Sequence, residues 1–421
     1  MNQNDRIGGG ALPEVLARHA ADGAFLWIVR DRGLGFPHLR LSDLCRIDER
    51  VEANIDGLRV SGEPGWEIAK AQFFEFGQAG ETFAAAVLAF ESSDPSKIQE
   101  VLALGMLKPE NLRALASALG WIAPSVAIPH IKMLLNSTDP SLKRVGLAGA
   151  AILRRNPGPA MMEAFASDDL VTKARALRAA GEIGLMDLQN TIRANLKSRD
   201  PGCRYWAAWS TALLSGHADA IAQLQSFAEN ATPFSETAAQ LVVRRLPIRD
   251  SRLWIKRLAK ELGRLRVAIK AIGALGDPDL IPWLIEQIKQ PALARVAGES
   301  LSLITGVDIT YDKLEGEKPD GFEAGPNDDP SDENVEMDPD ENLPWPDPSR
   351  VLSWWTRHKS SYSKDVRHIL GKPIGKESLR DALMKGYQRQ RAAAALELAI
   401  VNPGRPLFET RAPGFRQQRF F

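Results

Sequence analysis

The chain has 421 residues, of which 44% are hydrophobic and 25% are charged, an ordinary balance for a folded protein. Lys and Arg together total 53, and Asp and Glu also total 53, so the net charge does not indicate a nucleic-acid partner. The sequence holds no apolar run of about 18 residues or more, so we expect no transmembrane helix.

The first residues and the cysteines bear on the cellular compartment. The N-terminal sequence MNQNDRIGGGALPEVL lacks the basic segment and apolar core of a secretory signal. Cys45 and Cys203 are far apart in sequence and lie in apolar helical contexts, which is typical of reduced, buried thiols. We therefore expect a cytoplasmic protein that makes no contact with a membrane.

Residues 1–75 are predicted to form an N-terminal helical cap. The stretch 14–34 has apolar residues at helical spacing, with Phe25 on its apolar side. Ser42 is an N-cap candidate for a second helix, which we expect to end at Gly57.

A unit of about 30 residues recurs through residues 76–306. In each unit a turn precedes an Ala-rich helix, and a second helical pattern follows. Because a pair of helices cannot bury its own apolar face, neighbouring units are expected to stack into a solenoid. The residues that precede the Ala-rich helices are Gly80, Pro109, Pro140, Leu170, Pro201, Pro233, Gly263 and Pro291.

Asp-Pro opens several units, because Asp accepts the unpaired N–H groups of a helix start and Pro fits the first turn. An Arg follows within the helix, as at Arg144, Arg204 and Arg295. We expect Asp139 to pair with Arg144, and Asp200 with Arg204, within the stack. A ladder of arginines that binds phosphate or DNA is the alternative.

These residues resemble the HEAT-like repeats, especially the short bacterial kind of about 30 residues. The fold is therefore predicted to be all-α. We expect a right-handed HEAT-like α-solenoid of about eight helical hairpins, with non-repeat helices at both ends.

Residues 307–345 interrupt the repeat with many charged residues, Pro and Gly. From Glu315 to Glu341 there are twelve acidic residues and one basic residue, Lys318. Such a segment buries too little surface to offset its ordering entropy, so an acidic disordered loop is predicted, mobile over 312–342. The alternative, a calcium loop, lacks the ligand spacing of an EF-hand.

Residues 346–421 are predicted to form a C-terminal helical segment. Helices are expected over 348–359, 363–370 and 378–399, followed by an irregular end. The segment is strongly basic, so the acidic loop could fold back on it in a purely structural role.

No motif in the sequence indicates catalysis. The six histidines are scattered, and the chain contains no H-E-x-x-H pair, Walker loop or G-x-S-x-G elbow. We therefore predict no catalytic, cofactor-binding or metal-binding residues and no enzyme activity. The alternative is a HEAT-like enzyme or nucleic-acid-binding module of the lyase or glycosylase kind.

Ten tryptophans stand out in the composition. Large aromatic residues at helical spacing are typical of a core, but Trp and Arg also anchor protein interfaces. The candidates for protein binding are Trp206, Trp209, Arg204, Trp254, Trp283 and Trp355.

The two ends of the chain carry a second resemblance. Near the N-terminus it is carried by FLWIVRD and LCRIDERVEANIDGLRVSGEPGW. Near the C-terminus it is carried by LPWPDPSRVLSWWTRHKSSY, GYQRQRAAAALELAI and RAPGFRQQ. Together they resemble an uncharacterised proteobacterial family of HEAT-like repeat proteins whose genes often lie near type VI secretion clusters. The resemblance implies an accessory or adaptor protein, or an immunity protein, whose partner is an effector, a chaperone or a spike component.

Overall fold

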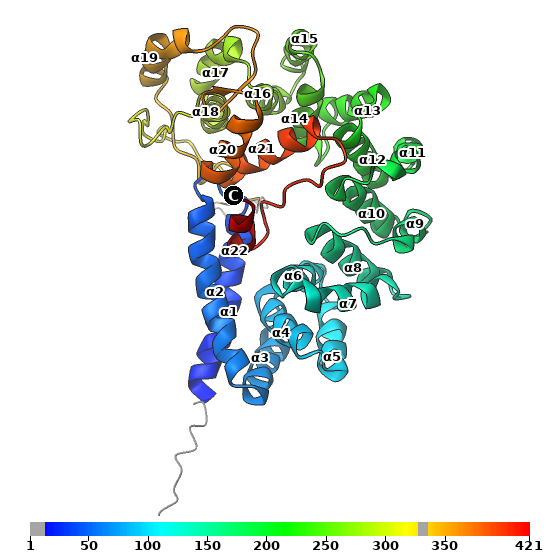
Figure 1. Ribbon diagram of the computed structural model, residues 1–421. Helices are drawn as coiled ribbons and strands as arrows, with labels where there is room; N and C mark the ends of the chain where they lie inside the picture. The colour runs from blue at the N-terminus through cyan, green and yellow to red at the C-terminus, as the bar shows by residue number, and fades with distance from the viewer. Residues whose placement is uncertain (1–12, 327–335) are drawn as a thin grey trace, which may run out of the picture. The chain divides into compact units, whose positions relative to one another are not determined.

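The computed structural model describes residues 13–326 and 336–421, and this part of the chain is all-helical (Figure 1). The chain divides into two compact units. Within the described residues, unit 1 contains 13–35, 41–179 and 411–421, whereas unit 2 contains 36–40 and 180–410. The division falls inside helix α10 (Leu170–Ile183).

Unit 1 is built from an N-terminal helix pair and a row of helical hairpins. Unit 1 includes the first part of α10. Its other elements are α1 (Pro13–Gly33), α2 (Leu41–Val60), α3 (Glu63–Phe76), α4 (Ala79–Ser92), α5 (Pro95–Gly105), α6 (Pro109–Trp121), α7 (Pro124–Leu135), α8 (Pro140–Ile152), α9 (Pro159–Phe165), α22 (Gly414–Gln417) and the 3₁₀ turn η5 (Gln418–Phe420). Helices α1 and α2 lie side by side (Figure 1). The Ala-rich helices α4, α6 and α8 pack in succession, and α7 packs against α8.

Unit 2 repeats this arrangement. The Ala-rich helices α12, α14, α16 and α18 pack in succession, while α13, α15 and α17 each pack against the helix that follows. The helices of unit 2 are α11 (Gln189–Ala194), α12 (Pro201–Leu214), α13 (Ala218–Glu229), α14 (Ser235–Arg245), α15 (Ile248–Leu258), α16 (Leu265–Leu275), α17 (Ile281–Ile288), α18 (Pro291–Thr305), α19 (Pro348–His358), α20 (Lys376–Lys385) and α21 (Gln388–Val401).

Short elements complete unit 2. The strands β1 (His368–Ile369) and β2 (Lys372–Pro373) form one antiparallel pair. The 3₁₀ turns are η1 (Met186–Leu188), η2 (Asn195–Lys197), η3 (Pro278–Leu280) and η4 (Lys359–Ser361). Across the part of the chain that the structure describes, none of the helices combines the length and apolar character needed to cross a bilayer.

The N-terminal helices differ in detail from the prediction. Helix α2 begins before Ser42 and continues through Gly57, where a side chain would overlap the ring of His19 on α1. Gly57 therefore allows α1 and α2 to approach instead of ending α2. Phe25 is 63% exposed, because the buried stripe of α1 runs through Leu16, Ala20 and Trp27.

The predicted pairing of arginines with the preceding Asp is wrong. Asp139 caps α8 through the Ser141 N–H, whereas Arg144 forms its ion pair with Asp169, 2.9 Å away, at the start of the next unit. Arg204 donates to the carbonyl groups of Ser198 and Arg199. The N-cap Asp already accepts the N–H groups of its own helix start, so the guanidinium groups reach other acceptors.

The acidic segment predicted over 307–345 is partly ordered in the described residues, and 327–335 lie outside them. Asp340 forms an ion pair with Arg266 on α16, and Asp338 forms one with Arg295 on α18. Leu343, near the end of the segment, is buried. Composition predicts a loop because it does not show that helices distant in sequence present guanidinium groups to these carboxylates.

The C-terminal segment also departs from the prediction. The stretch predicted as helix 363–370 is not helical, because it forms a turn at 364–365 and the strand β1, and the N–H groups of His368 and Leu370 pair with the carbonyl groups of Gly276 and Leu303. The helix predicted over 378–399 is divided into α20 and α21 at Gly386, whose backbone is extended.

Asp277 provides a test of the buried caps. It is fully buried, caps the Asp279 N–H and binds the Arg252 guanidinium through both carboxylate oxygens. Asp277→Ala should lower the free energy of unfolding by about 3 kcal/mol, because the guanidinium loses its buried partner. Asp94→Ala removes a cap without an ion pair and should cost about 1 kcal/mol. Equal costs in denaturant unfolding would contradict this role of Asp277.

Asp340 predicts a pH dependence. Burial raises its pKa, but the hydrogen bonds and charge of Arg266 outweigh burial and hold the pKa below the ordinary value of 3.8. Its contribution to stability is therefore complete above that value and is lost as the pH falls through the folded-state pKa. Asp340→Asn should lower the free energy of unfolding at neutral pH, and its difference from wild type should shrink in acid. The exposed Asp320→Asn should show no such difference at any pH.

Candidate binding groove on helix α2

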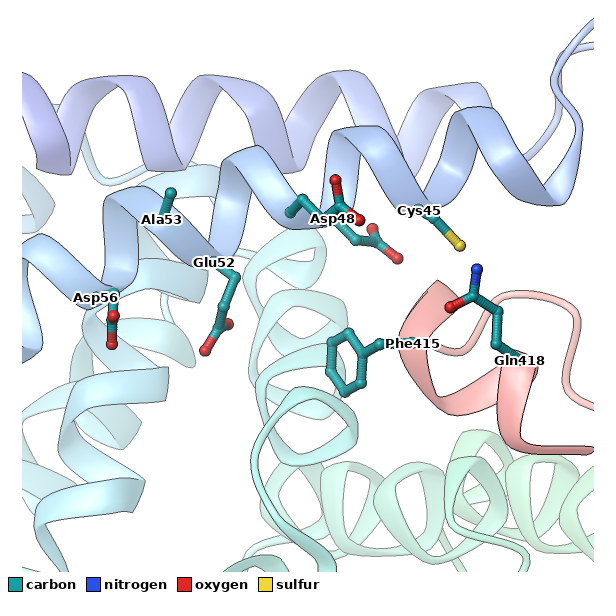
Figure 2. A pocket seen from close by; sticks show the side chains of 8 residues that line it. Cys45, Asp48, Glu52, Ala53, Asp56, Phe415 and Gln418 are labelled. Carbon is teal, nitrogen blue, oxygen red and sulfur yellow. The ribbon is translucent and has the colours of Figure 1, made fainter.

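A groove of about 390 Å³ runs along one face of α2 in unit 1 (Figure 2). The opposite wall comes from Phe415 and Gln418 near the C-terminus, which project toward α2. The residues that α2 contributes are spaced by three or four positions and therefore share one face. They are Cys45, Asp48, Glu49, Glu52, Ala53 and Asp56.

Asp48 is the most buried acidic residue of the groove, with 1% of its surface exposed. One carboxylate oxygen accepts the Arg30 Nε–H at 2.6 Å, and the other accepts the Gly414 backbone N–H at 2.6 Å. Burial raises the pKa of Asp48 despite the neighbouring Arg30. The carboxylate thus joins α1, α2 and the C-terminal segment.

Trp121, the last residue of α6, organises the aromatic side of the groove. Its ring meets the rings of Phe83 and Phe415 edge to face, with centroids 5.3 and 5.9 Å away. Its Nε1–H donates to Glu52 at 2.6 Å, and the Arg30 guanidinium lies over the ring. Edge-to-face contacts and a bonded indole N–H favour a fixed ring orientation, so Trp121 positions both Phe415 and Glu52.

The C-terminal segment is held by the end of α6. The Arg416 guanidinium donates to the carbonyl groups of Gly120, Trp121 and Ile122. Carbonyl groups at a helix C-terminus lack partners within the helix, so a guanidinium is a suitable cap. Arg30 also donates to the carbonyl of Arg411 at 2.8 Å.

The groove has an excess of negative charge. Four of its eight lining residues carry carboxylates, and none of the eight is Lys or Arg. Arg59 lies beyond the lining and binds Glu52 and Asp56, together with Glu91 on α4. Glu49 is exposed and has no hydrogen bond or ion pair within the described residues. The groove therefore presents at least one carboxylate that is available to a cation.

Unit 2 contains a larger cleft of about 630 Å³. Its floor includes the buried residues Val307, Ile309 and Leu343, and Tyr311 on its rim is 84% exposed. Several of its polar side chains are paired within unit 2. The Tyr387 hydroxyl donates to Asp308, and Glu299 binds Lys270 and Arg389.

Three of the six predicted binding residues lie together on α12. Trp206 and Trp209 meet edge to face, and Arg204 lies over the ring of Phe227. Trp209 is buried, whereas Trp206 and Arg204 are partly exposed. The three residues form one aromatic cluster with Tyr205, Phe227 and Phe234.

The other three predicted residues lie on separate helices. Trp254 on α15 is 1% exposed, and its Nε1–H donates to Glu229. Trp355 on α19 is also buried, whereas Trp283 on α17 is partly exposed. Burial gives Trp254 and Trp355 a packing role, which leaves Trp206, Arg204 and Trp283 accessible in part.

The prediction did not include the α2 groove. One signal was present, because the acidic residues of α2 recur at helical spacing. The partner wall gave no comparable signal, because more than three hundred and fifty positions separate Phe415 from α2. Among the residues with described positions, no cluster of three or more His, Cys, Asp or Glu has the arrangement of a metal site.

Comparison with known proteins gave no match for this chain among protein-family models, curated proteins or solved structures. The candidate site therefore depends on the geometry and charge of its own residues.

Arg416 tests the attachment of the C-terminal segment. Arg416→Ala leaves the terminal carbonyl groups of α6 without this cap and should lower the free energy of unfolding of unit 1 by about 1–3 kcal/mol. It should also make the last residues accessible to carboxypeptidase, measured by mass spectrometry. Arg419→Ala removes an exposed guanidinium three residues away and serves as the control. Equal digestion of the two variants would contradict the proposed cap.

Proposed function

We propose that the chain is a protein-binding scaffold that holds a cationic segment of a partner protein in the α2 groove. The scaffold in this proposal is a HEAT-like α-solenoid. In support, each Ala-rich helix within a unit packs against the next one, and intervening helices pack on the helix that follows. Stacked units of this kind provide long binding surfaces without a catalytic centre.

The observation that carries the proposal is the pairing of carboxylates with an exposed aromatic wall. Asp48, Glu49, Glu52 and Asp56 share one face of α2, and Phe415 stands opposite with 38% of its surface exposed. A Lys or Arg side chain has an apolar stem and a charged head. The stem fits against the phenyl ring, and the head meets the carboxylates.

The resemblance of the chain ends indicates the biological setting. We infer an accessory or adaptor role, or an immunity role, linked to type VI secretion. The partner in this setting is an effector, a chaperone or a spike component. In this proposal the chain is not an enzyme and uses no cofactor.

The experiment captures partners from a lysate of the native host on immobilised wild-type protein and on a variant with reversed charge in the groove. Glu49→Lys combined with Phe415→Ala should reduce recovery of the specific partner by about tenfold or more, since a charge-assisted contact contributes about 1.5–3 kcal/mol. Quantitative mass spectrometry measures the recovery. Glu49 is chosen because it is exposed and makes no hydrogen bond or ion pair with the residues that the structure describes.

Glu75→Lys is the matched control, because Glu75 is an exposed acid on α3 outside the groove. It should recover the partner at the wild-type level. Equal recovery by the groove variant and wild type would refute the groove as the binding site. Capture of no secretion component or neighbouring gene product by wild type would refute the assignment to type VI secretion.

A further inference from the structure

The last eleven residues of the chain are bound to unit 1 like a peptide ligand. Unit 1 supplies three kinds of contact to them. The buried Asp48 carboxylate accepts the Gly414 N–H, the Trp121 ring takes Phe415 edge to face, and the end of α6 accepts Arg416. All the groups that bind this segment lie in residues 13–179. The chain between these groups and the segment runs through residues 180–410.

The fit of the segment is specific at Gly414. A Cβ atom at this position would overlap the Sγ of Cys45 and crowd its backbone. Gly414 is buried, and so is Pro413 before it. The site thus favours a segment with a glycine where it passes close to α2. The next two residues of the segment supply an aromatic ring and a guanidinium.

The segment is also suited to leave and return. Residues 401–406 are exposed, and 407–410, which are partly buried, connect them to the segment. The segment's own regular structure is limited to a short helix and one 3₁₀ turn. Terminal segments with little regular structure open at low free-energy cost compared with core helices. The remaining unit 1 helices keep their mutual contacts, because α1, α2, α4 and α6 pack directly on one another.

We propose that the cleft formed by α1, α2 and the end of α6 is a peptide-binding site that can take the C-terminal segment of a second copy of this chain. The recognised pattern is Pro-Gly-Phe-Arg, residues 413–416, and the chain's own segment is the competing occupant. This inference concerns the site beneath the groove and does not depend on the cationic partner proposed above.

A labelled peptide of residues 408–421 tests the proposal on the full-length chain. Gly414→Val in the protein should release its own segment and leave the receptor groups unchanged. The peptide should then bind saturably in fluorescence polarisation. Binding to wild type should be at least about tenfold weaker, because a tethered segment competes at an effective concentration on the order of millimolar.

Matched peptides and a second protein variant make the test decisive. Peptides that carry Gly414→Val or Arg416→Ala should not bind, whereas Arg419→Ala should bind like the unchanged peptide. If Gly414→Val prevents folding, judged by circular dichroism and melting, the protein variant Arg416→Ala replaces it. Absence of saturable binding to a folded tail variant would overturn the proposal.

The second copy is tested by mixing two full-length variants. Asp48→Asn weakens the receptor and keeps the segment, whereas Gly414→Val weakens the segment and keeps the receptor. Light scattering of the mixture should show a species of two chains that the unlabelled peptide dissociates. A mixture that stays monomeric at concentrations where the peptide binds would overturn the second copy as the occupant.

Discussion

The structure depends on one constraint, which is that a pair of short helices cannot bury its own apolar face. The Ala-rich helices meet this constraint by close approach to their neighbours. In unit 2, Gly181 lies against Ser210 and Gly273 lies against Ser300, with no space for a larger residue between the helices. In unit 1, Gly146 likewise lies against the backbone of Leu134 and Leu135. Tight packing of this kind turns a chain of weak hairpins into continuous cores.

A second requirement follows from the many short helices, because each one ends in carbonyl groups without partners inside the helix. Residues distant in sequence satisfy them repeatedly. Arg416 caps α6, Arg245 donates to Leu213 at the end of α12, and Arg367 donates to Ala274 and Leu275 at the end of α16. The backbone of the β1 segment satisfies further carbonyl groups after α16 and on α18. Arg367 and Arg416 of the C-terminal part of the chain are thus bound to helix ends.

The acidic residues are also satisfied by distant partners. Asp338 binds Arg295 on α18, and Asp340 binds Arg266 on α16, which also binds Glu236 on α14. Among the four carboxylates of the α2 groove, Glu49 differs from the other three, because it forms no ion pair with the described residues. This contrast separates acidic residues that stabilise the fold from one that is available for binding.

The amino-acid sequence by itself determined the all-helical class, the helix starts at Asp-Pro and the 30-residue period, because these follow from spacing and local hydrogen bonding. It also marked a helix over 348–359, where α19 lies. Only the tertiary structure decided that Phe25 faces solvent, that 368–369 pairs with 372–373 as two short strands, and that Phe415 stands opposite the acidic face of α2. These outcomes depend on which carbonyl, carboxylate or ring from a distant part of the chain lies within a few ångströms. The linear order of residues does not show which distant groups come together in the fold.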